Sequence, residues 1–179
     1  MGIVSSTAGH GGGNSGKDKN QQAQQQDGEG QDRPDDGSHS QTLWILIFRG
    51  YPRDIQSTRV TELHIVFDEN ESRNLTIRIQ GHHPNFTVEE MWNQPHPRTR
   101  PHFYRRLAVA TVETSSELDM GLRDAISGSH VNNTESDWTC QSWVGDVLTT
   151  LQDARLITVE EGDNALNGMV NYIARAPWQ

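Results

Sequence analysis

The chain of 179 residues holds a single cysteine, Cys140, and no lysine after Lys19. One thiol cannot form a disulfide within the chain, so its role must come from packing or from reactivity. No apolar run approaches the length needed to span a bilayer, and the first residues lack the apolar core of a signal peptide. The sequence therefore predicts a soluble, cytoplasmic protein.

Positive charge is scarce as well. The formal net charge is −9, and the only adjacent pair of basic residues is Arg105-Arg106. Domains that bind nucleic acid usually gather lysines and arginines on one face, so this balance argues against nucleic acid as a partner. Every cation after Lys19 is an arginine, a bias that the sequence alone does not explain.

Large apolar side chains are almost missing from residues 1–41, where Gly, Gln, Ser, Asp and Asn dominate after Val4. Such a segment cannot bury enough apolar surface to repay the entropy of ordering. We therefore expect a disordered, low-complexity tail over residues 1–41 and a single domain over residues 42–179.

Hydrophobic spacing predicts that this domain is α+β. Strand patterns, either continuous apolar runs or strict alternation, occur over residues 43–48, 60–67, 75–80 and 103–112. Helical spacing occurs over residues 115–126, 140–155 and 164–174. Residues 81–101 are rich in His, Pro and Asn and should form a surface loop, with one helical turn at 88–92. We expect an antiparallel sheet of about four or more strands packed against the helix that starts at Cys140.

Cys140 lies where the helix over residues 140–155 is expected to begin. Asp137 or Thr139 can cap its first turn, and the free N–H groups and the dipole there stabilise an anion such as a thiolate. Reactive cysteines are often found in such positions. A free cysteine is also among the most buried residue types and often serves as a small hydrophobe. Position alone leaves both roles open.

A thiol nucleophile needs a base within hydrogen-bond reach, usually a histidine. Seven of the eight histidines fall in the tail or in and beside predicted loops. His64 alone lies within a predicted strand, on the face opposite Leu63 and Ile65, where the backbone would hold it as a catalytic base requires. A half-exposed strand residue without a catalytic role fits the same position.

Four short motifs, in a fixed order, carry a resemblance to a known family. They are Leu43–Pro52, Leu63–Phe67, Ile77–Gly81 and the run Cys140-Gln141-Ser142-Trp143-Val144. Together they resemble a group of uncharacterised fungal proteins, which look like circularly permuted relatives of the papain-like NlpC/P60 hydrolases. That superfamily also holds lecithin:retinol acyltransferase-like proteins and PPPDE peptidases. The resemblance implies a permuted papain-like fold that spans residues 43–157.

The resemblance also implies roles for individual residues. Cys140 would be the nucleophile, and His64 would take its proton. The third polar group in the superfamily comes from the strand after the histidine, where Gln80 would orient the imidazole. Relatives often carry a histidine near Arg78, the alternative third position, but an arginine cannot accept the imidazole N–H. They also tend to have Asn where this chain has Thr139.

The implied chemistry is attack of the thiolate on an acyl carbon, followed by transfer of the acyl group to water or an amine. The substrate would be a small-molecule or peptide amide, ester or thioester, and the reaction needs no cofactor and no metal. Trp138 and Trp143 flank the thiol in sequence. They are expected either to line an apolar acyl site or to belong to the core.

Metal binding is one competing interpretation, because His82, His83, His96 and His102 are clustered in the sequence. Their spacing matches no tight zinc motif, and solvated loop residues explain them better.

Two non-enzymatic interpretations also remain. A binding or scaffold protein that keeps the fold without the activity would suit the arginine at position 78. A membrane-tethered adaptor would use Gly2, since Met1-Gly2-Ile3-Val4-Ser5-Ser6 fits the pattern for N-myristoylation. Without that acyl chain we expect no membrane contact.

Overall fold

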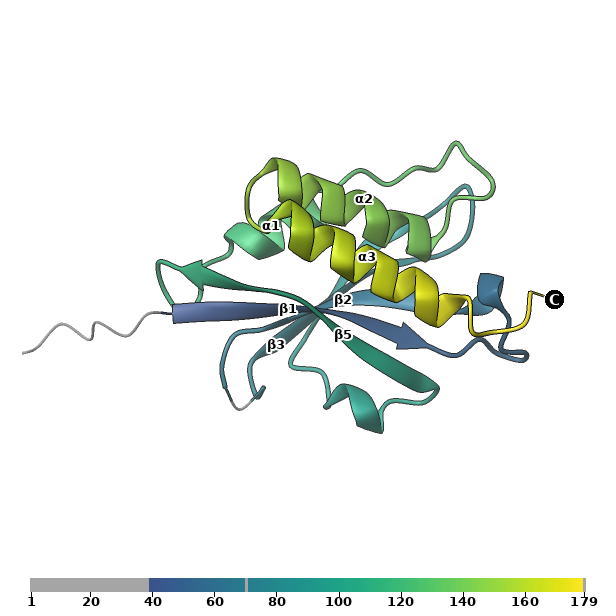
Figure 1. The fold of residues 1–179 in the computed structure, drawn as a ribbon, viewed down its shortest axis with the longest axis horizontal. Helices are drawn as coiled ribbons and strands as arrows, with labels where there is room; N and C mark the ends of the chain where they lie inside the picture. Colours follow the sequence, from purple (N-terminus) through teal and green to yellow (C-terminus); the bar gives the residue numbers. More distant parts are fainter. Residues whose placement is uncertain (1–38, 70, 179) are drawn as a thin grey trace, which may run out of the picture. The chain divides into compact units, whose positions relative to one another are not determined.

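A computed structural model describes residues 39–69 and 71–178. Its five strands form one antiparallel sheet in the order β4-β3-β2-β1-β5 (Figure 1). The strands are β1 (His39–Phe48), β2 (Val60–Val66), β3 (Asn74–Gln80), β4 (Thr87–Trp92) and β5 (Phe103–Thr114). Strands β1 to β4 pair in chain order, whereas β5 returns to the free side of β1. The edges of the sheet are therefore β4 and β5.

Three helices follow the sheet in the chain: α1 (Gly121–Ser127), α2 (Cys140–Asp153) and α3 (Val159–Ile173). They lie on one side of the sheet, above the strands in Figure 1. The segment between β4 and β5, with a short 3-10 helix at Pro97–Thr99, lies on the other side, below the strands. A second 3-10 helix at Gln56–Thr58 precedes β2. The two faces of the sheet thus have different coverings.

The hydrophobic core lies between the sheet and the helices. Leu63 and Ile65 of β2 are fully buried there, together with Trp143 and Val147 of α2. Because successive side chains of a strand point to opposite faces, Glu62 and His64 point away from the helices. This alternation decides which residues of β2 can meet Cys140.

The α+β class predicted from the sequence is confirmed, and the four predicted strands correspond to β1, β2, β3 and β5. The helical turn predicted at residues 88–92 is wrong, because these residues belong to β4. Cross-strand contacts stabilise this edge strand: Arg78 Nε of β3 donates to Glu89 Oε2 at 2.7 Å, and the Trp92 ring stacks on Phe67. Periodicity over five residues could not reveal those partners.

Two helices begin elsewhere than predicted. Helix α1 starts at Gly121 and not near residue 115, because the Asp119 carboxylate accepts hydrogen bonds from Ser115 Oγ and Gly121 N, both at 2.8 Å. These bonds favour turns ahead of the helix. Helix α3 starts at Val159 and not at residue 164, because Thr158 and Glu161 form a capping box.

The boundary between tail and domain also moves. Strand β1 begins at His39, so residues 39–41 belong to the sheet and not to the predicted tail. Gln41 is buried and its Nε2 donates to the carbonyl oxygen of Asp119 at 2.6 Å. The rest of the tail prediction, and the Gly2 acylation site, lie outside the described residues. None of the helices in the described ranges is both long enough and apolar enough to cross a membrane.

Candidate functional site

Cys140 is the first residue of α2, as the helical spacing predicted. Thr139 forms the N-cap: its hydroxyl accepts from Gln141 N at 3.2 Å, and its own N–H donates to Ser142 Oγ at 3.3 Å. A capping box of this kind satisfies amide groups at the helix start. Thr139 therefore fixes the position of the thiol and is the cap that the sequence analysis offered beside Asp137.

The thiol points at the start of strand β2. The N–H of Thr61 lies 3.5 Å from Cys140 Sγ, and Sγ lies 3.9 Å from the carbonyl oxygen of Arg59. Thr61 shares the helix-facing side of β2 with Leu63 because the two residues are two positions apart. Two backbone groups, an N–H and a carbonyl oxygen, thus contact the sulfur, and neither is a base at neutral pH.

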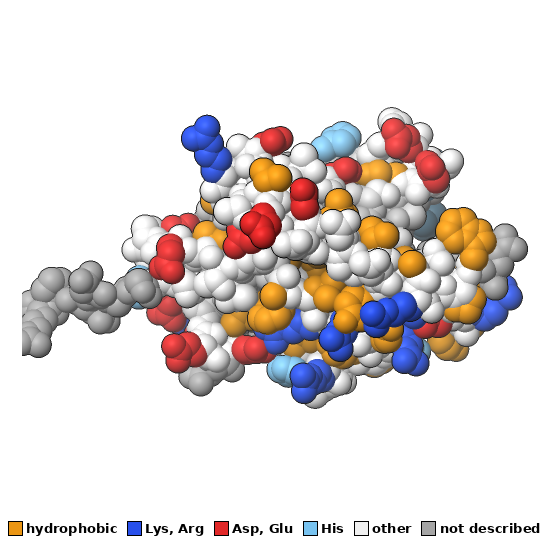
Figure 2. All heavy atoms as spheres, in the orientation of Figure 1, with side chains coloured by type: hydrophobic (Ala, Val, Ile, Leu, Met, Phe, Trp, Pro, Cys, Tyr) orange, Lys and Arg blue, Asp and Glu red, His pale blue; other side chains and the backbone are white. Residues whose placement is uncertain are grey.

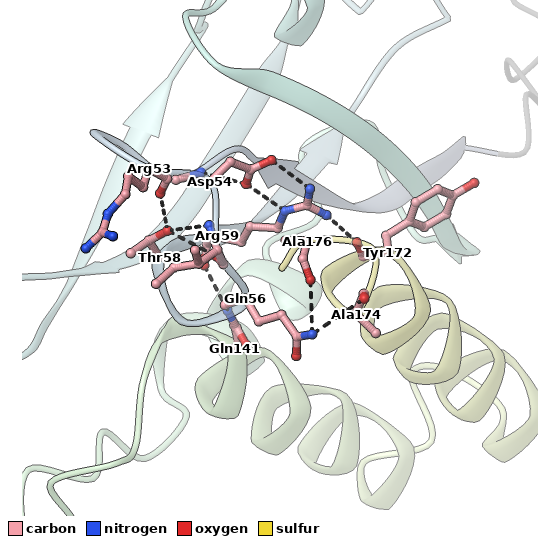
Figure 3. A network of polar contacts seen from close by, with 11 residues as sticks. Arg53, Asp54, Gln56, Thr58, Arg59, Gln141, Tyr172, Ala174 and Ala176 are labelled. Atoms are coloured by element: carbon pink, nitrogen blue, oxygen red, sulfur yellow. Dashed lines mark hydrogen bonds and ion pairs between the residues drawn. The ribbon is translucent and has the colours of Figure 1, made fainter. Parts of the chain in front are cut away.

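A network of polar contacts holds the segment before β2 against both helices (Figure 3). Gln141, the neighbour of Cys140, donates to the carbonyl oxygens of Gln56 and Arg59 at 2.8 and 2.9 Å. Arg59 Nε and Nη2 donate to the Asp54 carboxylate, each at 2.8 Å, and Nη1 donates to the carbonyl oxygen of Tyr172 in α3. These contacts make the surroundings of the thiol a packed junction of three elements.

His64 lies on the opposite face of the sheet from Cys140. In the sheet register it stands between Trp44 of β1 and Thr76 of β3, and its Nδ1 is hydrogen-bonded to Thr76 Oγ1 at 2.9 Å. The side chain is 1% exposed, and its Nε2 has no hydrogen-bond partner within the described ranges. The structure therefore does not bring the proposed base to the proposed nucleophile.

Desolvation shifts the pKa values of both groups. Desolvation, with a further contribution from the positive charge of Arg106, lowers the pKa of His64 to about 4, so the imidazole is neutral at pH 7. Desolvation also raises the pKa of the Cys140 thiol, although the hydrogen bond from the Thr61 N–H acts the other way. A catalytic thiol needs the reverse shift, which a nearby cation provides.

The residues expected at the third catalytic position have other partners. Arg78 pairs with Glu62 at 3.2 Å and with Glu89 at 2.7 Å. Glu62 is 1% exposed and also accepts from Arg100 at 2.6 Å, so its buried carboxylate is held by two guanidinium groups. Gln80 is exposed at the end of β3, opposite Thr87 of β4. Neither Arg78 nor Gln80 is a partner of His64.

The two tryptophans beside the thiol belong to the core. Trp143 is fully buried, and Trp138 is 5% exposed with its Nε1 donating to Asp146 Oδ2 at 2.9 Å. The Trp138 ring also packs edge to face on Phe86. Of the two predicted roles for these residues, packing is the one that their burial supports.

The clustered loop histidines do not form a metal site in the described part of the chain. No group there brings three or more His, Cys, Asp or Glu side chains together. His96 instead accepts from Arg98 N at 3.2 Å and lies 3.6 Å from the Glu71 carboxylate, while the His102 ring packs against Tyr51.

Sequence analysis missed a cluster of arginines around two tyrosines, Tyr104 of β5 and Tyr172 of α3. The guanidinium groups of Arg49 and Arg59 lie 5.2 and 4.4 Å from the ring centre of Tyr104. Those of Arg105 and Arg175 lie 5.0 and 4.2 Å from the ring centre of Tyr172. The two rings meet edge to face at 6.1 Å. We call these six residues the arginine–tyrosine cluster.

The arginine–tyrosine cluster gives a physical reason for the absence of lysine from the domain. A planar guanidinium stacks on an aromatic ring and still offers N–H groups at its edge, which an ammonium group cannot do. The bidentate pairing of Arg59 with Asp54 uses the same geometry. The sequence shows the bias toward arginine, but it does not show which aromatic rings the arginines contact.

Comparison with protein-family models, curated proteins and solved structures finds no match to this chain.

Proposed function

We propose that this chain is a non-catalytic binding domain, related to the permuted papain-like hydrolases, in which Cys140 packs and does not react. The observation that carries the proposal is the environment of the sulfur, which faces Thr61 and the backbone of Arg59. His64, the base that the sequence predicted, lies on the other face of the same sheet. A thiol with a raised pKa and no adjacent imidazole lacks both features of an activated nucleophile.

The relation to papain-like folds is part of this proposal. It is supported by the order of the elements: the strands of an antiparallel sheet come first, and the second helix after them begins at the cysteine and contacts the start of β2. Thr61 then stands at the strand position nearest to the sulfur, where an active relative needs its base. If the β2–β3 register is continued by two residues, Ile79 of β3 stands opposite Thr61, so the neighbouring strand offers no base at this position either.

Cysteine-dependent hydrolysis or acyl transfer is the competing function. It would use the start of α2, where a capped helix end favours an anion. This reaction would still need a proton acceptor for Cys140, and Sγ has no histidine among its hydrogen-bond partners in the described residues.

Labelling with an acyl-transfer probe separates the two functions. We expect wild-type protein to be labelled no faster than its Cys140→Ala variant, and His64→Ala to leave that background unchanged. An inhibitor-sensitive label on wild type that disappears in both variants would overturn the proposal. Circular dichroism of each variant shows whether it is folded, and alkylation of Cys140 in guanidinium chloride confirms that the thiol is intact.

A further inference from the structure

Three segments that are far apart in sequence meet at one end of the sheet, where β1 ends and β5 begins. Arg49 N donates to the carbonyl oxygen of His102 at 2.8 Å, which joins the end of β1 to the start of β5. Gln56 N donates to the carbonyl oxygen of Pro177 at 3.0 Å, which adds the residues after α3. These two hydrogen bonds hold the end of β1, the start of β5 and the residues after α3 next to one another, so that the three segments form one continuous surface.

This end carries unpaired positive charge. Five exposed arginines form no ion pair with a carboxylate in the described ranges: Arg49, Arg53, Arg98, Arg105 and Arg175. Arg155, which follows α2, is the other arginine of this kind and borders a different hollow with Thr111 and Glu113. Figure 2 shows blue side chains gathered below α3 and along β5, whereas red ones lie mainly over the helices and toward the start of β1.

Two large aromatic side chains project from the same end. Tyr51 is 77% exposed and Trp178 is 76% exposed. Tyr51 follows Arg49 closely in the chain, and Trp178 borders a hollow of about 290 Å³ with Gln56 and Ser57. Exposed tryptophans and tyrosines beside arginines are typical of surfaces that bind at the interface of a lipid bilayer. There the apolar part of the ring contacts lipid, while its polar N–H or O–H group contacts water.

The arginine–tyrosine cluster argues against single-stranded nucleic acid as the partner. Bases stack on open aromatic faces, but Tyr104 and Tyr172 each hold two guanidinium groups against their rings. The edges of Arg49, Arg105 and Arg175 stay available for anionic oxygens such as those of phosphates. Charge and exposed aromatic rings together favour an extended anionic surface over a base-stacked strand.

We propose that this end, with its five unpaired arginines and the exposed rings of Tyr51 and Trp178, docks on the surface of an anionic lipid bilayer. The proposal names a partner for the binding role suggested above and rests on that role. It involves no spanning helix and no acyl chain, and it therefore departs from the expectation, drawn from the sequence, that membrane contact needs an acyl chain on Gly2. The acidic side chains that Figure 2 shows over the helices would be repelled by such a surface, whereas the unpaired arginines would be attracted to it.

The test is sedimentation of the full chain, made without N-myristoylation, with vesicles of phosphatidylcholine alone or with about one third phosphatidylserine. We expect binding only to the anionic vesicles, weakening as salt is raised, because the attraction is screened. The triple variant Arg49→Gln/Arg105→Gln/Arg175→Gln should bind about a hundredfold more weakly. The matched control Arg155→Gln should bind as wild type does.

A second variant keeps the test informative if the triple variant does not fold. Trp178→Ala removes only an exposed ring and should lower vesicle binding by about tenfold. Equal sedimentation with both kinds of vesicle, or with neither, would overturn the proposal. Binding to a polyglutamate peptide without binding to anionic vesicles would instead assign the surface to an acidic protein partner. A protein that does not bind anionic vesicles could still give the acyl-probe result expected of a non-catalytic domain. The two experiments therefore test membrane docking and the non-catalytic role separately.

Discussion

At the scale of single residues, the alternation of β2 has the largest consequences. Thr61, Leu63 and Ile65 face the helices, while Glu62 and His64 face the segment between β4 and β5. Sequence patterning predicted these two faces correctly. The error came from joining His64 to Cys140, because the pattern shows which residues share a face but not which face the helix covers.

His64 should make stability depend on pH. Its folded pKa of about 4 lies below the unfolded value of about 6.5, so the unfolded state binds the proton first. The stability due to the neutral imidazole is present above pH 6.5 and is lost as pH falls toward 4, by about 3 kcal/mol at most. Urea unfolding at several pH values measures this slope.

His64→Gln should reduce that slope between pH 6.5 and pH 4, apart from the contributions of carboxylates. His130→Gln, at an exposed position, is the matched control and should keep the wild-type slope. An unchanged slope in His64→Gln would mean that the imidazole is not buried as described.

At the scale of elements, the segment between β4 and β5 acts as the cover of the second face. Pro97 is buried, and Arg100 reaches the carboxylate of Glu62 with two hydrogen bonds of 2.6 and 3.0 Å. A buried carboxylate that loses one of its partners becomes costly, since the remaining charge is left less compensated. Attachment of this cover therefore depends strongly on Arg100.

Arg100→Gln should lower the free energy of unfolding by about 2–3 kcal/mol. It should also speed hydrogen exchange in β2 and β3, because the cover over Glu62 and His64 loosens. Arg98→Gln provides the control, since Arg98 is exposed and has no ion pair within the described part of the chain. A loss of stability as large in the control as in Arg100→Gln would contradict this account.

Most elements could be predicted from the sequence because local signals were strong. The apolar run of β1, the alternation of β2 and β3, and the stripe on α2 each follow from local side-chain spacing. Strand β4 could not be predicted in this way, since its stability depends on Arg78 and Phe67 of other elements. The start of α1 depended on turn bonds of Asp119 that periodicity does not report.

The candidate site was harder to predict than the fold. Cys140 at the start of α2 was predicted correctly, and Thr139, one of the two proposed caps beside Asp137, is the N-cap. Thr61, however, gives no local signal, because its importance comes only from lying 3.5 Å from the sulfur of a residue 79 positions away. The arginine–tyrosine cluster likewise forms only when the ends of β1, β5 and α3 meet.

At the scale of the whole molecule, the described domain separates three properties in space. Cys140 lies at the junction of α2 with β2, and the buried polar groups Glu62 and His64 lie on the far face. Of the unpaired arginines, Arg49 directly follows β1 and Arg105 stands opposite Ile47 near the end of that strand. In a papain-like hydrolase the cysteine and the histidine would have to lie side by side. Their separation is the main reason for proposing that the domain is a binding module.

The most direct test of this separation is the pH dependence of Cys140 alkylation by iodoacetamide in the native protein. We expect wild type and His64→Ala to react alike and to reach half of the maximal rate at a pH above the pKa of a free thiol, about 8.5. Thr61→His should react at lower pH, because an imidazole then faces the sulfur. Half-maximal alkylation of wild type well below pH 8.5, lost in His64→Ala, would contradict the account.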